Sequence, residues 1–575
     1  MLEVLLPSNQ QVLGIIMNMK IVVIAVVAVL LVGGGATAFM LTRGDDKADA
    51  SITAGMVMSS GAETFGYGDM GTYYLRGANL FQENLVSVDE KGDYVGLLAE
   101  SWSANSDASK WTFVLRDDVK WSDGEKFTAD DVIFTISYLI DTEPWGLNDA
   151  GFLRSLSHYT KQDSKASSQS YYKGTNADGK ETVTIEMNQP YSNLLLNMRS
   201  GLSILPQHIY KDVKDAMTYG DPKTELNAAT GTGPFIVKSL DTESRTMKLE
   251  RNPDYYLGQP KAKEFTIIYY STWDVATLAL QQGTIDLILN WGSGLSDAAA
   301  KSIADDSSVS IKKYASAAPF GICFNNKKAP YDNKDMREAL SYAVDYDKLV
   351  KLILGGNGKV ADKSIVASCM LYFKSNGKMT YNVNTAKEKL AALGYEDTDD
   401  DGYIDVAGVK WQPTLAFSAS SADIAAIVKE SFNAAGIDLQ LESVASGWGA
   451  WKKTLDGDGF RKYDMILSGA SHLGAFTWSG YCTTVVDRAG SLADCQVDDP
   501  TFKTLVSNIN SASTPTAMKT AVEALQDWYA ANLPMIPFYE KEIIGAQRSN
   551  VTGIYMDPQF AYTMCHLTLM NMDVE

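Results

Sequence analysis

The densest group of side chains that could bind a metal ion is an acidic turn with the sequence DTDDDGYID. Its carboxylates Asp397, Asp399, Asp401 and Asp405 occupy positions 1, 3, 5 and 9 of an EF-hand-like calcium loop, with Gly402 at position 6. Position 12 is a glycine, so the bidentate glutamate of a complete loop is missing. Two interpretations stay open: a structural Ca²⁺ site, or a plain acidic turn in which Gly402 supplies a positive φ. Ca²⁺ is the one cofactor that the sequence suggests, and none is required.

Side chains that usually perform catalysis are sparse. The four histidines, at positions 158, 208, 472 and 566, include no pair with the spacing of a helical zinc site. No nucleophile-elbow motif or Walker loop occurs, and Pro234 spoils the GTGPF segment as a dinucleotide fingerprint. We therefore predict a protein that is not an enzyme and has no catalytic residues. A hydrolase built on an unrecognised carboxylate pair is the minor alternative.

The balance of charge excludes one large class of partner. The chain has 575 residues, of which 70 are acidic and 50 basic, and its formal charge is −20. No basic stripe is available to neutralise nucleic-acid phosphates, so we expect no nucleic-acid partner. The length suggests several domain-sized units.

The N-terminus contains an uncharged apolar run from Ile21 to Leu41, which is long enough to span a bilayer. We interpret residues 1–18 as an over-extended start, 19–42 as a transmembrane anchor or signal, and 43–51 as a polar tether. An uncleaved anchor on the outer face of the cell membrane is the favoured interpretation. Cleavage at Ala36–Ala38, which would release a secreted or periplasmic protein, is the alternative.

A location outside the cytoplasm permits disulfides. Cys482 and Cys495 are the closely spaced pair among five cysteines, and a bridge between them would close a loop of moderate length. Two free thiols are the alternative. Cys323, in the strand-like FGICFNN, is expected to be a buried apolar residue.

The stretch from Trp111 to Thr135, WTFVLRDDVKWSDGEKFTADDVIFT, changes its period halfway. Alternating apolar residues from Trp111 to Leu115, resuming at Val119, predict a half-buried strand pair. An Asp-Gly turn follows. Thr128 and Asp131 then have the spacing of a capping box, which predicts a helix start at this point.

Other elements follow from the same rules. Strands are predicted in KEFTIIYY, VTIEMN and YDMILSG, and GTGPF is expected to form a tight turn before the strand FIVKSL. A helix is predicted over DNKDMREALSYAVDYDKLVKLIL, with Asp332 or Asn333 as its N-cap. A second helix begins with Pro515 in its first turn and ends before Pro534.

Several of these blocks, in this order, resemble the extracytoplasmic solute-binding proteins of the peptide/nickel class of ABC importers (family 5). The blocks are LLAESW followed by the stretch from Trp111, then GTGPF with KLERNPDYYLGQP, ALQQGTIDLIL, FNNKKAPYDNKDMREALSYAVDYDKLV and LPMIPFYEKEI. The resemblance implies a mixed α/β (α+β) fold of the two-lobed periplasmic-binding-protein type. It is the large, three-domain, class II form, in which two chain crossings make a hinge. The acidic corner near Thr128 then belongs to the scaffold rather than to the ligand site.

The resemblance also implies a division into domains. Domain I would comprise residues 52–97, 219–319 and a return at 538–575, domain II residues 98–218, and domain III, the second lobe, residues 320–537. The lobes would close on a solute and present it to membrane permease subunits, and we expect a monomer. A sensor that presents its ligand to a membrane receptor is the alternative function.

The resemblance implies less about the ligand. Peptide-binding members have an aspartate after the strand that matches YDMILSG, but this chain continues ASHLGAFTWSGYC, without one. A short peptide and a nickel- or metal-chelate-type ligand therefore both stay open. Arg199 lies near a family position that contacts a ligand carboxylate, although it could equally form a surface ion pair. The proposed ligand-binding residues are Arg199, His472, Phe476, Trp478 and Trp145, with Tyr67 and Met70 added from a glycine-rich loop.

Overall fold

The chain divides into two compact units, Met1–Asp46 and Lys47–Glu575, and every described residue belongs to the second. None of the helices among the described residues is long and apolar enough to cross a membrane. The computed structural model describes residues 50–58, 62–66, 78–143, 151–215, 218–289, 294–316, 320–364, 366–444, 463–469, 495, 497–512, 514–557 and 563–575.

One large sheet runs through the described chain, with the strand order β18-β17-β19-β13-β20-β11-β1-β10-β9-β8. In its first part β1 lies parallel to both β10 and β11, and β9 and β8 continue it as antiparallel strands. The strands of this part are β1 Ala50–Val57, β8 Phe235–Asp241, β9 Thr246–Arg251, β10 Ala262–Tyr270, β11 Leu287–Leu289 and β12 Val309–Ala315. The predicted strands KEFTIIYY and FIVKSL are confirmed.

In the second part of the sheet β17 lies parallel to β18 and β19, and β13 lies antiparallel to β19 and β20. The predicted strand YDMILSG is confirmed as β19. The strands of this part are β13 Phe320–Phe324, β14 Gly358–Val360, β17 Thr414–Ser418, β18 Gln440–Val444, β19 Met465–Gly469 and β20 Met535–Arg548.

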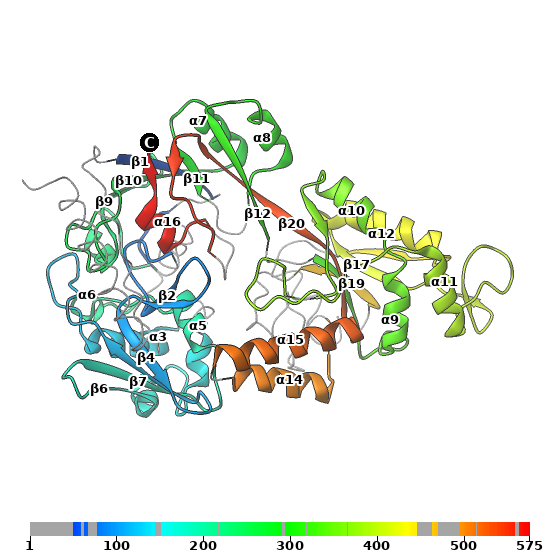
Figure 1. Ribbon diagram of the computed structural model, residues 1–575, viewed down its shortest axis with the longest axis horizontal. Coiled ribbons are helices and arrows are strands. Elements are labelled where there is room, and N and C mark those ends of the chain that lie inside the picture. The colour runs from blue at the N-terminus through cyan, green and yellow to red at the C-terminus, as the bar shows by residue number, and fades with distance from the viewer. Residues whose placement is uncertain are drawn as a thin grey trace, which may run out of the picture. The chain divides into compact units, whose positions relative to one another are not determined.

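β20 is the strand that the two parts share, and Figure 1 shows it running from β12 and β11 to β17 and β19. Its residues from Met535 to Lys541 pair with β13 and β14. From Glu542 to Arg548 it pairs with β12 and, at Gln547, with β11. We therefore call residues 320–541 the second half and the remaining residues of the larger unit the first half. β12 of the first half ends at Ala315, β13 of the second half begins at Phe320, and the chain returns to the first half at 541–542.

A separate four-stranded sheet, with the order β4-β5-β7-β6, belongs to the first half. Trp111, Phe113 and Leu115 alternate inward along β5, as predicted, and β7 confirms the predicted strand VTIEMN. The segment around Val119 forms an isolated bridge, Lys120 with Lys126, instead of the predicted second strand, since the intervening turn leaves room for one pair. The strands are β4 Ala99–Ala104, β5 Lys110–Leu115, β6 Tyr171–Thr175 and β7 Glu181–Glu186.

The predicted capping box is confirmed at the start of α3 (Ala129–Thr142). The Asp131 carboxylate accepts a hydrogen bond from the Thr128 backbone N–H at 2.9 Å. The same carboxylate also accepts from the backbone N–H of Gln207 at 3.0 Å and from the Trp121 indole at 3.4 Å. Asp131 therefore joins three segments, and the corner is scaffold.

The prediction of one continuous helix from Asp332 is wrong. The segment consists of α9 (Lys334–Ser341) and α10 (Tyr346–Ile353), with Asn333 as the N-cap of α9. The Asp345 side chain accepts a hydrogen bond from the Lys348 backbone N–H at 2.9 Å and caps the N-terminus of α10. Because a new helix starts at this cap, α9 does not continue through it. The helix with Pro515 in its first turn is confirmed as α15 (Pro515–Asn532).

The remaining elements complete the two halves around separate apolar cores. The helices are α4 Ser164–Ser167, α5 Leu194–Gly201, α6 Gln207–Tyr210, α7 Trp273–Gln281, α8 Asp297–Ser302, α11 Val383–Ala392, α12 Ala422–Ala434, α14 Pro500–Asn510 and α16 His566–Asn571. The short strand pairs are β2 Val86–Val88 with β3 Tyr94–Gly96, β15 Asp405–Val406 with β16 Val409–Lys410, and β21 Val551–Thr552 with β22 Asp573–Val574.

Candidate functional site

Arg199 lies on α5 and is paired with an aspartate near the end of the chain. Its guanidinium donates to the carboxylate of Asp557, and the side chains of the two residues are only 6% and 4% exposed. The sequence left two roles open for Arg199, a ligand contact or a surface ion pair. The structure gives it a buried ion pair, in which each charge compensates the other.

α5 is held in place by the segment that precedes β2. The Asn84 side-chain amide donates to the Arg199 carbonyl at 2.6 Å, and the Ile204 backbone N–H donates to the Glu83 carbonyl at 2.8 Å. Asn84 is in turn fixed because its backbone N–H donates to the Asn79 side chain at 2.8 Å. The position of Arg199 is therefore determined by a buried polar segment more than 100 residues earlier in the chain.

Beside this segment lies a buried carboxyl group, that of Glu83, which is 0% exposed. The hydroxyls of Tyr255 and Tyr256 donate to its two oxygens at 2.6 and 3.0 Å. Burial raises the pKa of Glu83 to about 8, although the tyrosine hydrogen bonds oppose this shift. The Arg116 guanidinium lies 5.2 Å from the centre of the Tyr256 ring, which closes the cluster on that side.

His566, at the start of α16, extends the same cluster. Its Nε2 lies 2.9 Å from the Tyr255 hydroxyl. Burial lowers the pKa of His566 to about 4, and the nearby positive charge of Arg199 adds to the effect, so the imidazole is neutral at physiological pH. The Tyr255 hydroxyl lies between the Glu83 carboxyl group and the neutral His566 imidazole. The hydrogen-bonded chain Glu83–Tyr255–His566 thus links the segment before β2 to α16.

Sequence reasoning missed Glu83 and its partners. The available signal was the polar triplet Gln82-Glu83-Asn84, which interrupts an apolar run from Leu80 to Val86. All three side chains are buried, with exposed fractions of 2% or less. A buried polar triplet must be hydrogen-bonded, so its partners could have been expected, but not identified.

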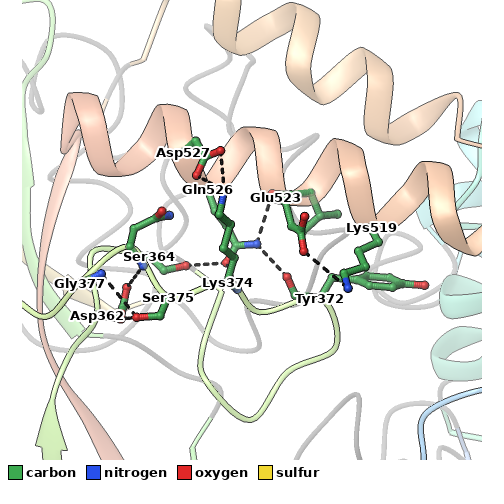
Figure 2. A network of polar contacts seen from close by, with 12 residues as sticks. Asp362, Ser364, Tyr372, Lys374, Ser375, Gly377, Lys519, Glu523, Gln526 and Asp527 are labelled. Atoms are coloured by element: carbon green, nitrogen blue, oxygen red, sulfur yellow. Dashed lines mark hydrogen bonds and ion pairs between the residues drawn. The ribbon is translucent and has the colours of Figure 1, made fainter.

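In the second half, Gln526 on α15 anchors the long loop between β14 and α11 (Figure 2). Its Oε1 accepts from the Ser364 hydroxyl and from the Lys374 backbone N–H, each at 2.9 Å. Its Nε2 donates to the Tyr372 carbonyl at 2.8 Å. At the surface, the Lys374 ammonium pairs with Asp527 at 2.6 Å. A neutral amide thus holds this loop, without a buried charge.

The same loop borders a pocket of about 190 Å³. The Glu540 carboxylate, 8% exposed, accepts from the backbone N–H of Ser368 at 3.0 Å and pairs with the Lys359 ammonium at 3.0 Å. The pocket is smaller than most sites for drug-sized ligands. Its second acid, Asp362, already accepts a hydrogen bond from the Asn376 backbone N–H at 2.8 Å. It is lined by Lys359, Val360, Asp362, Ser368, Phe373, Ser375, Lys378 and Glu540.

The acidic turn brings together three of its four predicted ligands. Oxygens of Asp397, Asp399 and Asp405 lie within 4.8 Å of one another. Asp401 is directed instead to Lys410, with 2.5 Å between its carboxylate and the ammonium, and this pair lowers the pKa of Asp401. Asp405 accepts from the backbone N–H and the hydroxyl of Thr398 at 2.9 and 2.6 Å. These contacts account for the turn without an ion, and the calcium site stays a prediction.

The other predicted ligand-binding residues, Tyr67, Met70, Trp145, His472, Phe476 and Trp478, lie outside the described residues. So does Cys482. Its predicted partner Cys495 is buried in the core of the second half, where its side chain packs as a small group among apolar residues. Because Cys482 is not among the described residues, the bridge stays a prediction. Cys323 is buried, as expected.

Known proteins resemble this chain over most of its length. A family model for bacterial extracellular solute-binding proteins, family 5 (middle part), matches residues 93–483. The oligopeptide-binding protein AppA of Bacillus subtilis (strain 168) is 26% identical over 371 residues, an alignment that covers 64% of this chain and 64% of AppA. The match thus spans a little under two thirds of that relative.

Solved structures share the fold at low sequence identity. AppA from Bacillus subtilis, in complex with a nonapeptide, has a TM-score of 0.64 and 22% identity, with 92% of this chain and 100% of AppA covered. NikA from Brucella suis, in complex with Fe(III)-EDTA, has a TM-score of 0.70 and 18% identity, with 91% and 100% covered. NikZ from Campylobacter jejuni, in complex with Ni(L-His), has a TM-score of 0.63 and 19% identity, with 90% and 98% covered. These likenesses confirm the predicted mixed α/β fold.

Proposed function

The chain belongs to family 5 of the bacterial extracellular solute-binding proteins, and from this premise we propose that it captures a small solute outside the cytoplasm for an ABC importer. The observation that carries the proposal is the family match across residues 93–483, which includes most of both halves. Membership of a solute-binding family also bears out the expectation that the protein is not an enzyme.

The mechanism that we propose uses the two places where the chain passes between the halves. β20 belongs to both parts of the large sheet, and a bend at Lys541–Glu542 would move one half against the other. Closure is favoured only if the solute binds the closed form more tightly than the open one. The closed form would then be the one that docks on the permease.

For the solute we propose a short peptide, with a metal chelate as the second candidate. AppA is named for oligopeptides, and NikZ was solved with Ni(L-His), so both ligand classes occur among proteins of this fold. The pair formed by Arg199 and Asp557 supports the peptide. An anionic chelate that relied on Arg199 would have to displace Asp557, whereas a peptide can be held through its main chain.

Two measurements test the choice of solute. Mass spectrometry under native conditions would identify whatever co-purifies with the protein. Isothermal titration of the emptied protein would then compare a mixture of short peptides with Ni²⁺–L-histidine. Binding of peptides but not of Ni²⁺–L-histidine supports a peptide as the solute. Binding of Ni²⁺–L-histidine alone would show instead that the solute is the second candidate, a metal chelate. Heat in neither titration would contradict both.

We also propose that the apolar run from Ile21 to Leu41, outside the described residues, is an uncleaved membrane anchor. Its length and the polar residues on either side support this proposal. Membrane fractionation followed by N-terminal sequencing tests it. Recovery of a protein that begins after Ala38 would show instead that the segment is a cleaved signal.

A further inference from the structure

A pocket of about 310 Å³ lies beside β20 at the point where this strand passes from one half to the other. Its volume falls at the lower end of the range for sites that hold small organic ligands. The first half, the second half and β20 all contribute to its wall. The lining residues are Leu295, Ser296, Ile353, Leu354, Asn357, Tyr539, Lys541, Glu542 and Ile544, and we call this space the crossing pocket.

Two glycines allow both walls of the crossing pocket to lie directly on β20. A Cβ atom on Gly294 would come within 2.5 Å of the Ile544 carbonyl oxygen, and one on Gly358 within 2.7 Å of the Glu540 carbonyl oxygen. Next to Gly294, the Leu295 backbone N–H donates to the Ile544 carbonyl at 2.9 Å. Close main-chain contact therefore fixes both walls, so the space between them is built into the fold.

Apolar side chains form one part of the wall of the crossing pocket. Leu295, Leu354 and Ile544 are buried, with exposed fractions of 5%, 5% and 3%, and Ile353 is half-buried beside them. The Tyr539 ring completes this surface, and burial raises the pKa of its phenol to about 12. The hydroxyl therefore stays neutral. An aliphatic group in this space would be removed from water at little cost in polar desolvation.

One of the two charged side chains that line the crossing pocket has a partner of opposite charge among the described residues, and the other does not. The Glu542 carboxylate is already paired with the Lys313 ammonium at 3.3 Å, and the same ammonium donates to the Asn357 side chain at 2.6 Å. Lys541 is exposed, and none of the described acidic side chains forms an ion pair with it. The lining thus presents one uncompensated positive charge next to an apolar surface.

We propose that the crossing pocket binds a small amphipathic carboxylate, with its aliphatic part against Leu295, Leu354 and Ile544 and its carboxylate on the Lys541 ammonium. The proposal rests on the lining of the crossing pocket and does not depend on the proposed transport function. Because both halves line the pocket, any movement between them would change its shape. An occupant would therefore be coupled to that movement, and the coupling would be reciprocal.

The probe for this proposal is octanoate, a straight-chain carboxylate, added to the full-length protein and followed by saturation-transfer NMR and isothermal titration. We expect octanoate to bind and octylammonium, which has the same chain with the opposite charge, to bind at least about tenfold more weakly. Absence of any octanoate signal at about 1 mM, the weakest affinity of interest, overturns the proposal. So does equal binding of the two probes.

Two variants locate the binding, each with a matched control. Ile353→Trp fills the pocket and should abolish octanoate binding, whereas Leu352→Trp, at the neighbouring position that is 58% exposed, should not. Lys541→Gln should weaken octanoate about tenfold, whereas Lys351→Gln on α10 should leave it unchanged. If Ile353→Trp fails to fold, the comparison of Lys541→Gln with Lys351→Gln still tests whether octanoate binds in the crossing pocket. Octanoate binding that is equal in Lys541→Gln and the wild type overturns the proposal.

Discussion

The buried cluster around Glu83 and Arg199 in the first half and the acidic turn at 397–405 in the second half are both dense in ionisable groups. In the cluster, the side chains of Arg199 and Asp557 are 6% and 4% exposed. In the turn, those of Lys410 and Asp401 are 35% and 34% exposed. Water screens the second pair but not the first, so the same kind of contact has a different energetic weight in each region. Burial, rather than the number of charges, decides which region is sensitive to substitution.

The largest expected effect is on the buried side of this comparison. Asp557→Ala removes the carboxylate that is paired with the buried Arg199 guanidinium, and we expect the free energy of unfolding to fall by about 3–5 kcal/mol. Urea denaturation followed by fluorescence measures this change. The double variant Arg199→Met with Asp557→Leu should recover most of the loss, because it removes both charges. A loss in the double variant as large as in the single one would contradict this account.

The second prediction uses pH to separate the two regions. The pKa of Glu83 in the folded protein, about 8, lies above its ordinary value of 4.5. The folded protein therefore keeps a proton that the unfolded chain releases between these values. The stability that Glu83 contributes is fully present below pH 4.5 and is lost as the pH rises through 8.

We expect Glu83→Gln to remove roughly 4 kcal/mol of this pH dependence between pH 5 and 9, because the amide does not ionise. Urea denaturation at several pH values measures the slope. The control is Glu90→Gln, in the exposed turn between β2 and β3, which should keep the wild-type slope. An unchanged slope in the Glu83 variant would mean that this carboxyl group ionises normally.

The third prediction extends the comparison to a buried polar group without charge. Gln526→Ala removes the acceptor for the Lys374 backbone N–H and the donor to the Tyr372 carbonyl. We expect a loss of about 2 kcal/mol and faster hydrogen exchange at the Lys374 amide. Gln281→Ala on α7, which loses one exposed hydrogen bond to the Ser302 carbonyl, is the control and should cost less. Unaltered exchange at Lys374 would show that the loop does not depend on Gln526.

The smallest expected effect is on the exposed side. Lys410→Gln breaks the ion pair with Asp401, and we expect no resolvable change in the urea midpoint at physiological salt. NMR titration should show the pKa of Asp401 returning upward, since the hydrogen bond from Lys410 is the main cause of its lowered value. A clear loss of stability in this variant would contradict the statement that the exposed ion pair contributes much less to stability than the buried one.

Much of the fold could be predicted because the relevant signals are local. Thr128 and Asp131 are three residues apart, and their capping box forms wherever the surrounding chain lies. Gly231 is an exception: it was expected in a tight turn, but the chain there forms only bends, and a Cβ would come within 1.7 Å of the carbonyl oxygen of the distant Phe81. The helix break at Asp345 was missed, because an apolar face that continues across two helices hides the N-cap between them.

The candidate site was less accessible to such reasoning. Arg199 was identified through a resemblance, but its partner Asp557 lies 358 positions away, and nothing in either local sequence indicates the contact. In the acidic turn the spacing predicted that four aspartates could bind one metal ion. In the structure three of them lie close together, and Asp401 forms an ion pair with Lys410 instead. Spacing predicts which side chains lie near one another, but not which partner each prefers.

The sequence by itself determined several of the strands, the starts of α3 and α15, and which protein family the chain belongs to. These properties depend on periodicity, on caps and on the order of motifs, all of which can be read along the chain. Only the tertiary structure decided that Arg199 is neutralised by Asp557, that Glu83 keeps its proton, and that β20 has a pocket at its crossing. Such properties depend on burial and on contacts between distant segments, because the cost of an unpaired charge is set by the groups that exclude water from it.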